Sequence, residues 1–232
     1  MPYNMAMNLL YCLLLLGLTP LASSAQSFVF PKFEKTVQSV GDLVPPRWHI
    51  KDSVSGDLNK DGRADMAMVL EYADTVREIR PDSMESTDHP RILVVLFRDS
   101  STGGYRPICQ NNMFIVRETE GGMGGDPYGD LNIRNNILTV SIEFLRETAK
   151  YKFRWQKGDL YLIGASDYGA EAATGDMDGW EFNFSTNKAK HTWSKGGSSK
   201  EHVEWKTFRP RSIRLRDLRQ YGAIEIFENA SI

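Results

Sequence analysis

Cysteine is scarce in this sequence. Only Cys12 and Cys109 occur among 232 residues, and Cys12 falls within an apolar N-terminal run that we expect to be removed. The processed chain would then hold one thiol, which excludes an intrachain disulfide framework and paired-cysteine zinc sites. Stability must therefore come from the apolar core and from any metal that the chain binds.

Recognisable catalytic motifs and an excess of charge are also missing. The histidines are His49, His89, His191 and His202. None has a zinc-ligand spacing such as H-E-x-x-H, and the chain has no G-x-S-x-G nucleophile motif. Charge is nearly balanced, with 28 Lys and Arg against 30 Asp and Glu. We therefore expect neither nucleic-acid binding nor membrane-surface binding driven by bulk charge.

The apolar run at the N-terminus, Leu9–Leu18, is too short to span a bilayer. A transmembrane helix needs roughly 20 apolar residues, and Pro20 follows this run closely. Small residues at Ser23 and Ala25 fit a signal-peptidase site. We therefore expect residues 1–25 to be a signal peptide, and the protein to be periplasmic or secreted without a membrane span. The remaining residues, 26–232, suit one domain.

An acidic loop, D-L-N-K-D-G-R-A-D, is the strongest local signal in the chain. It places oxygen-bearing side chains at loop positions one, three, five and nine, and glycine at position six. This is the spacing of a calcium loop, in which position seven adds its backbone carbonyl and the glycine permits the tight turn. The predicted Ca²⁺ ligands are Asp57, Asn59, Asp61, Arg63 and Asp65.

A metal-free turn is the alternative to a calcium loop. Asp61-Gly62 between apolar runs is itself a hairpin signal, although such a turn does not need the other oxygen-bearing side chains. An EF-hand is excluded, because it needs a glutamate where Met68 stands and a helix on each side. An apolar run of strand length, Met66–Tyr72, follows the loop instead. We therefore predict that the loop is the tip of a β-hairpin over residues 48–72.

Residues Gly56–Leu70 resemble one copy of the FG-GAP or VCBS-type repeat, whose core reads G-D-x-N-x-D-G-x-x-D followed by apolar residues. The order of later segments is similar to that of a family of small exported bacterial proteins of uncharacterised role. This broader resemblance covers most of residues 48–208. It implies a mostly antiparallel β fold, without the repeated copies of a full propeller, and it implies no activity.

Hydrophobic patterning independently predicts a mainly β fold. We expect antiparallel hairpins or a meander that form one sandwich-like or partial-propeller-like domain. Arg91–Phe97 has the length and β-branching of a buried strand. Phe33, Val37 and Val40 have helical spacing, which predicts a short N-terminal helix over Lys32–Val40.

Two further stretches have both a structural and a functional interpretation. Gly121–Gly125 is dense in glycine but lacks the following helix of a phosphate loop. We favour a structural loop over a ligand-facing one. Tyr151–Trp155 alternates aromatic and basic residues. This pattern is typical of a half-buried strand, which we favour, and also of a stacking platform for single-stranded nucleic acid.

The sequence predicts an exported, calcium-binding β module with a structural or binding role. We expect a monomer whose partner is a protein or a glycan. The alternative is a hydrolase that acts on cell-envelope or extracellular polysaccharide, with Glu71, Glu143 and Glu171 as candidate carboxylates. A cleft that holds two carboxylates of perturbed pKa would favour the hydrolase.

Overall fold

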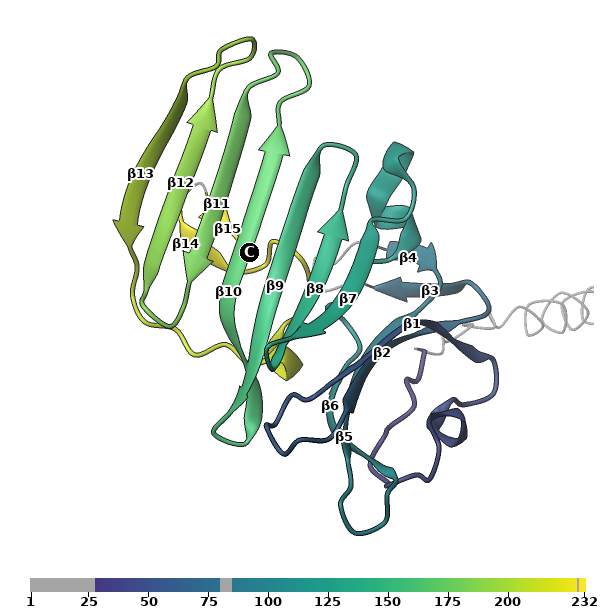
Figure 1. The fold of residues 1–232 in the computed structure, drawn as a ribbon. Helices are drawn as coiled ribbons and strands as arrows, with labels where there is room; N and C mark the ends of the chain where they lie inside the picture. The colour runs from purple at the N-terminus through teal and green to yellow at the C-terminus, as the bar shows by residue number, and fades with distance from the viewer. Residues whose placement is uncertain (1–27, 80–84, 229) are drawn as a thin grey trace, which may run out of the picture.

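The computed structural model describes residues 28–79, 85–228 and 230–232, and it is built almost entirely from antiparallel strands (Figure 1). The prediction of a mainly β fold is confirmed. The predicted signal peptide lies outside the described residues. Among the described residues, no helix has the length and apolar composition needed to cross a membrane.

Two antiparallel sheets dominate the fold. The smaller sheet has four strands in the order β1-β2-β5-β6, with bounds Trp48–Gly56, Asp65–Tyr72, Arg91–Arg98 and Tyr105–Asn111. The larger sheet is a seven-stranded meander in which β7 to β13 pair in chain order. Its strands are Tyr128–Arg134, Ile137–Glu143, Glu147–Gln156, Asp159–Ala170, Met177–Asn183, Lys188–Ser194 and Glu201–Thr207.

Short elements complete the fold. Two small hairpins pair β3 (Val76–Ile79) with β4 (Glu85–Asp88), and β14 (Glu225–Phe227) with β15 (Ala230–Ser231). The 3-10 helices are η1, η2 and η3, at Val40–Leu43, Glu118–Gly124 and Leu215–Asp217.

The main core lies between the two sheets, as in a β-sandwich. From the smaller sheet it takes Ala67, Val69, Leu93, Val95 and Phe97. From the larger sheet it includes Leu138, Val140, Phe153, Leu162 and Phe182. Because side chains alternate along a strand, the intervening residues of β2 and β5 point to the opposite face. These intervening residues form a second core, which includes Met68, Leu70, Ile92, Val94 and Leu96. Strand β5 is therefore buried on both faces, which explains its continuous apolar sequence.

The N-terminal segment covers the second core and corrects one expectation. The predicted helix over Lys32–Val40 is wrong in position, because the short 3-10 helix η1 begins only at Val40, the last residue of that span. The chain before Val40 is not helical, and Val37 instead exchanges backbone hydrogen bonds with Tyr105 at 2.9 and 2.7 Å. Phe33, Val37 and Val40 still pack against the second core, but they do so from a largely extended chain.

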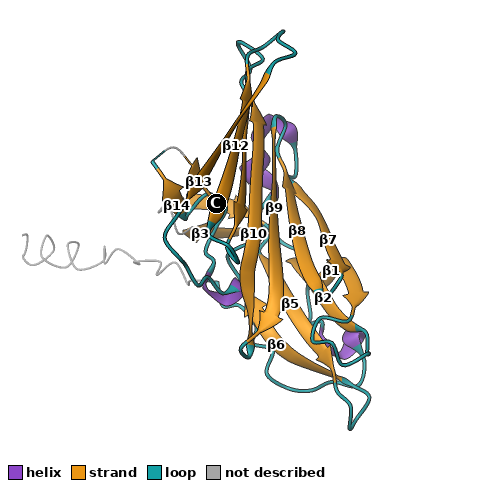
Figure 2. Cartoon of the chain, turned by 60° about the vertical axis from the view of Figure 1, so that its left-hand side comes forward, coloured by secondary structure: helices purple, strands orange, loops and turns teal. Residues whose placement is uncertain are grey.

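The two faces of the larger sheet have different surroundings. Its inner face meets the smaller sheet and the C-terminal segment, and η3 contacts both β6 and β10. Figure 1 shows β14 and β15 on this inner side, and Figure 2 shows β14 there from a second direction. Over β9 to β13, no described element covers the opposite, outer face. The fold therefore leaves a broad sheet surface open to solvent.

Candidate metal centre

The β1–β2 hairpin presents the acidic loop. Its register runs from Trp48 opposite Tyr72 to Gly56 opposite Asp65, so the loop begins directly after the last pair. Gly62 has a φ of 80°, a left-handed conformation that glycine adopts at little cost. The local backbone thus has the reversal that the sequence motif predicted.

Three of the predicted ligand side chains fold over the loop backbone. Asp57 Oδ2 accepts a hydrogen bond from the Gly62 amide at 3.1 Å, and Asn59 Oδ1 accepts one from the Asp61 amide at 2.9 Å. Asp61 Oδ1 accepts from the Arg63 amide at 2.9 Å. Each side-chain oxygen therefore accepts a hydrogen bond from a backbone amide two to five residues further along the loop, and the loop is ordered by its own polar groups.

Asp65 has a different environment, because it is fully buried. Its carboxylate accepts hydrogen bonds from the amides of Leu58 at 2.8 Å and Arg98 at 3.0 Å. Burial raises the pKa of Asp65, and the charge of Asp61 acts in the same direction. The side chain joins the start of the loop to the end of β5.

The loop also docks on the larger sheet. Asn136, in the β7–β8 turn, donates from Nδ2 to the backbone carbonyl of Asp57 at 2.6 Å. Leu58 is only 1% exposed and belongs to the main core. A Cβ added to Gly56 would lie 2.5 Å from Ile133 Cγ2 of β7. The loop therefore spans the junction between the two sheets.

The donor set fits a calcium ion in its chemistry. Three carboxylates, one amide oxygen and the carbonyl of Arg63 are hard ligands, and an oxygen that accepts one N–H keeps a further lone pair. Within residues 28–79, 85–228 and 230–232, however, no three Asp, Glu, His or Cys side chains gather into a group that could hold a metal. The loop carboxylates are turned onto backbone amides, and calcium binding stays a prediction.

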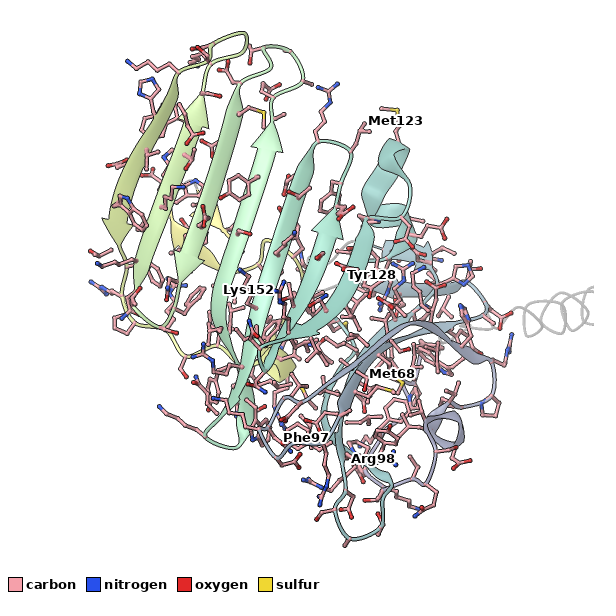
Figure 3. All side chains as sticks on the ribbon, in the orientation of Figure 1. Met68, Phe97, Arg98, Met123, Tyr128 and Lys152 are labelled. Carbon is pink, nitrogen blue, oxygen red and sulfur yellow. The ribbon has the colours of Figure 1, made fainter. Side chains whose placement is uncertain are left out.

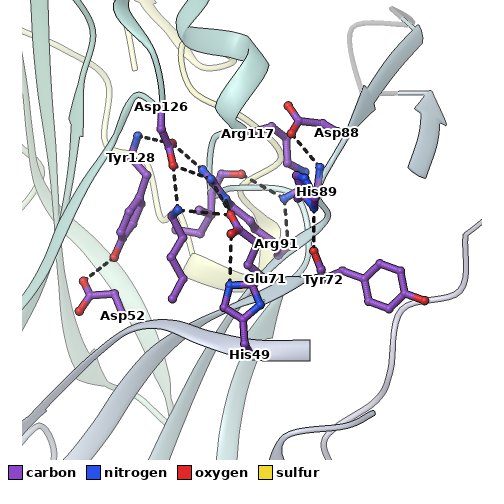
Figure 4. A network of polar contacts seen from close by, with 12 residues as sticks. His49, Asp52, Glu71, Tyr72, Asp88, His89, Arg91, Arg117, Asp126 and Tyr128 are labelled. Atoms are coloured by element: carbon purple, nitrogen blue, oxygen red, sulfur yellow. Dashed lines mark hydrogen bonds and ion pairs between the residues drawn. The ribbon is translucent and has the colours of Figure 1, made fainter. Parts of the chain in front are cut away.

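A buried ion network lies elsewhere between the sheets (Figure 4). Arg91 is 0% exposed and donates to Glu71 at 2.6 Å and to both Asp126 oxygens at 2.8 and 2.6 Å. Lys51 contacts the same two acids at 3.3 and 2.8 Å. Burial opposes ionisation, yet the bonds from Arg91 and Lys51 lower the pKa of Asp126 to about 2. Groups that titrate so far from neutrality are suited to cross-linking rather than to proton transfer.

An acidic cavity of about 690 Å³ lies between the inner face of the larger sheet and β14–β15. Glu147, Asp167 and Asp178 line it together with Trp180. Burial, repulsion by Glu147 and Asp178, and a hydrogen bond with Glu147 raise the pKa of Asp167 to about 7. Burial also raises the pKa of Glu147. This cavity therefore holds two neighbouring carboxyl groups whose pKa values are both raised.

The sequence pattern did not indicate this pair. Its three candidate carboxylates lie on separate elements: Glu71 in the ion network, Glu143 exposed at the end of β8, and Glu171 exposed after β10. Glu147 and Asp167 come together only through the β9–β10 register. Alternation along both arms of that hairpin was the one available signal, because it places both residues on one face.

The two ambiguous stretches have clear structural roles. A Cβ on Gly121 would lie 2.9 Å from Pro127 Cδ, and one on Gly124 would lie 3.2 Å from Leu145 Cβ, so close packing accounts for these glycines. Tyr151–Trp155 is part of β9, and Tyr151 and Phe153 are buried in the main core. These two rings therefore face away from the basic side chains with which they alternate.

Comparison with models of known protein families, with curated proteins and with solved structures finds no match for this chain. The features of this chain that bear on its function are therefore the acidic loop, the ion network and the surfaces of the larger sheet.

Proposed function

We propose that the protein is an exported, calcium-stabilised β module with a structural or binding role. The ion would be held by Asp57, Asn59, Asp61, Arg63 and Asp65. One observation carries the proposal: the loop that contains these residues contacts the β7–β8 turn through Asn136 and buries Leu58 between the sheets. An ion bound there would couple the β1–β2 hairpin to the larger sheet.

The charge distribution of the loop supports a structural role for the ion. Asp57, Asp61 and Asp65 lie within one tight loop, and the charge of Asp61 already opposes ionisation of the buried Asp65. A divalent cation would convert this repulsion into attraction. Calcium supplies charge and coordination at this position, and the chain's own residues then hold the hairpin against the sheet.

The test is thermal unfolding with calcium, with magnesium and with chelator. At free calcium one hundred times the dissociation constant, binding adds about 2.7 kcal/mol to the free energy of unfolding. For a chain of this size, that raises the midpoint by roughly 5–10 °C. Magnesium should be less effective, because it requires a smaller octahedral shell and retains its waters.

Two variants make the test specific. Asp61→Asn keeps an acceptor for the Arg63 amide but removes a charge, and it should lose most of the calcium response. Asp99→Ala is the matched control, because Asp99 also accepts backbone amides in an exposed turn, from Ser101 and Thr102, but lies outside the motif. This control should keep the full response. An unchanged wild-type midpoint, with no heat of binding at millimolar calcium, would refute the proposal.

Polysaccharide hydrolysis is the second candidate, and the acidic cavity is the observation that favours it. Two carboxyls of raised pKa beside Trp180 meet the condition stated from the sequence. Their mutual hydrogen bond argues against it, because glycosidases separate the two carboxyls by about 5–5.5 or 6.5–9.5 Å. Release of reducing ends by wild type, abolished in Asp167→Asn, would place hydrolysis first.

A further inference from the structure

The outer face of the larger sheet carries a groove of about 630 Å³. We call it the outer-face groove and define it by Lys152, Arg154, Tyr168, Lys188, Lys190 and Trp205. Figure 3 shows side chains along this face, among them the labelled Lys152. None of the described elements packs over these strands.

The strand register assembles the groove from neighbouring cross-strand rows. The first row places side by side Lys152, Gly164, Asn183 and Lys188. The second row holds Ser166, Glu181, Lys190 and Trp205. Gly164 has no side chain, so the sheet surface is low between the lysines of the first row. Long polar side chains therefore surround a shallow floor.

The groove concentrates positive charge in a chain whose net charge is −2. Its lining includes four cationic side chains and one carboxylate, that of Glu181. Glu181 already accepts hydrogen bonds from Tyr168 and from Lys190, the latter at 3.4 Å. A face adapted only to solvent mixes charges of both signs. This face instead has a cationic surplus, which complements a polyanion.

Trp205 adds an exposed aromatic surface to the groove. It lies on the edge strand β13, and 66% of its surface is exposed. An exposed indole offers a flat apolar face and one N–H donor. Asn183, Ser166 and Thr186 in the lining supply amide and hydroxyl groups that bond neutral hydroxyls. Cations, a stacking ring and neutral hydrogen-bonding groups thus share one surface.

We propose that the outer-face groove binds an acidic polysaccharide. The anionic groups of the polymer would pair with Lys152, Lys188 and neighbouring cations, and a sugar ring would stack on Trp205. Single-stranded nucleic acid fits less well, because it uses a series of aromatic platforms, and Tyr151 and Phe153 of β9 face the core. This inference goes beyond the calcium role, since no groove residue belongs to the acidic loop.

The experiment measures binding of the full chain to polygalacturonate by calorimetry and by tryptophan fluorescence at low and moderate salt. Lys152→Glu/Lys188→Glu should weaken binding at least about tenfold, because like charges then meet across the surface. The matched control is Lys35→Glu/Lys200→Glu, which changes net charge equally at exposed positions outside the groove. Affinity of this control should stay within about twofold of wild type, as expected for distant rim charges.

Stacking is tested separately on β13. Trp205→Ala should lower the affinity several-fold, whereas Val203→Ala, also exposed on the outer face of β13, should not. Lys188→Gln, a milder change, keeps the charge test valid if the double variant does not fold. Asp61→Asn should bind polygalacturonate like wild type at a temperature below the thermal unfolding midpoint of the variant. Failure of the calcium proposal can therefore be distinguished from failure of the polysaccharide proposal.

Three results would overturn the proposal. The first is equal loss of affinity in the groove and control double variants, which would indicate bulk charge alone. The second is equal binding of the neutral polymer dextran, which would remove the role of the cations. The third is tighter binding of oligothymidylate than of polygalacturonate, which would assign the groove to nucleic acid.

Discussion

Replacement of Arg91 by methionine should destabilise the protein more than any exposed substitution of the same type. The guanidinium has no exposure to solvent and contacts Glu71, Asp126 and the Val116 carbonyl. Removing it leaves two acids with Lys51 as the remaining cation of the network. Breaking a buried ion pair by deleting one partner costs about 3–5 kcal/mol.

This cost translates into a clear thermal shift. At about 2–4 °C per kcal/mol for a chain of this length, Arg91→Met should lower the midpoint by roughly 6–20 °C. Arg77→Met is the matched control, because Arg77 pairs with Glu85 on an exposed hairpin. An exposed pair contributes about 0–1 kcal/mol, so this control should melt near wild type.

A double-mutant cycle and a pH series identify the cause. Asp126→Asn added to Arg91→Met should cost less than the two single changes combined, since the unpaired charge is then absent. The folded pKa values of Glu71 and Asp126 lie below their unfolded values. Their contribution to the free energy of unfolding is therefore complete above about pH 5 and is lost as pH falls towards 2. The decrease in the free energy of unfolding with falling pH should be smaller in Arg91→Met than in wild type.

Additive effects in the cycle, or a loss in the free energy of unfolding below about 1 kcal/mol for Arg91→Met, would refute a stabilising role for the buried network. Either result would mean that water reaches the cluster and screens it, as it does at exposed ion pairs. Chemical unfolding in urea, with an unchanged slope between variants, gives the free energies needed for the comparison.

Two further predictions concern the carboxyl group of Asp167 in the acidic cavity and the buried thiol of Cys109. The pKa of Asp167 is raised to about 7, so its contribution to the free energy of unfolding is full below about pH 4 and is lost as pH rises towards 7. Asp167→Asn keeps an acceptor for the Tyr221 hydroxyl, and it should remove this decline from unfolding curves measured as a function of pH. Burial raises the pKa of the Cys109 thiol to about 12, so thiol reagents at pH 8 should label native protein far more slowly than unfolded protein. Reduction should leave the thermal unfolding midpoint unchanged. Fast labelling of the native chain would contradict the buried position of this thiol.

Local patterns were sufficient for much of the fold. The apolar run predicted as a strand over Arg91–Phe97 is β5, which extends one residue further. The acidic loop indeed joins two paired strands. Both are short-range features, in which strand propensity, turn chemistry and burial agree. The N-terminal helix was misplaced because the spacing of Phe33, Val37 and Val40 also suits an extended segment that is anchored to Tyr105.

Long-range pairing set the limit of prediction for the sites. Asn136 meets Asp57 across 79 residues, and Arg91 meets Asp126 across 35. No local period encodes such partners, because they depend on how the two sheets stack. Glu147 and Asp167 are closer in sequence, yet their raised pKa values depend on burial by the C-terminal segment. Turn chemistry thus predicted the hairpin turn of the acidic loop, and only the tertiary fold explains where the loop docks.

The near-neutral total charge conceals a separation of charge across the larger sheet. The inner face holds the acidic cavity around Asp167, whereas the outer face holds the cationic groove around Lys188. Successive side chains of a strand point to opposite faces. Asp167 and Asp178 therefore lie on the inner face and Lys152 and Lys188 on the outer face, and their charges cancel in a sum but not in space. A balanced composition therefore excludes a uniformly charged surface, and it leaves room for a local basic groove that recognises a polyanion.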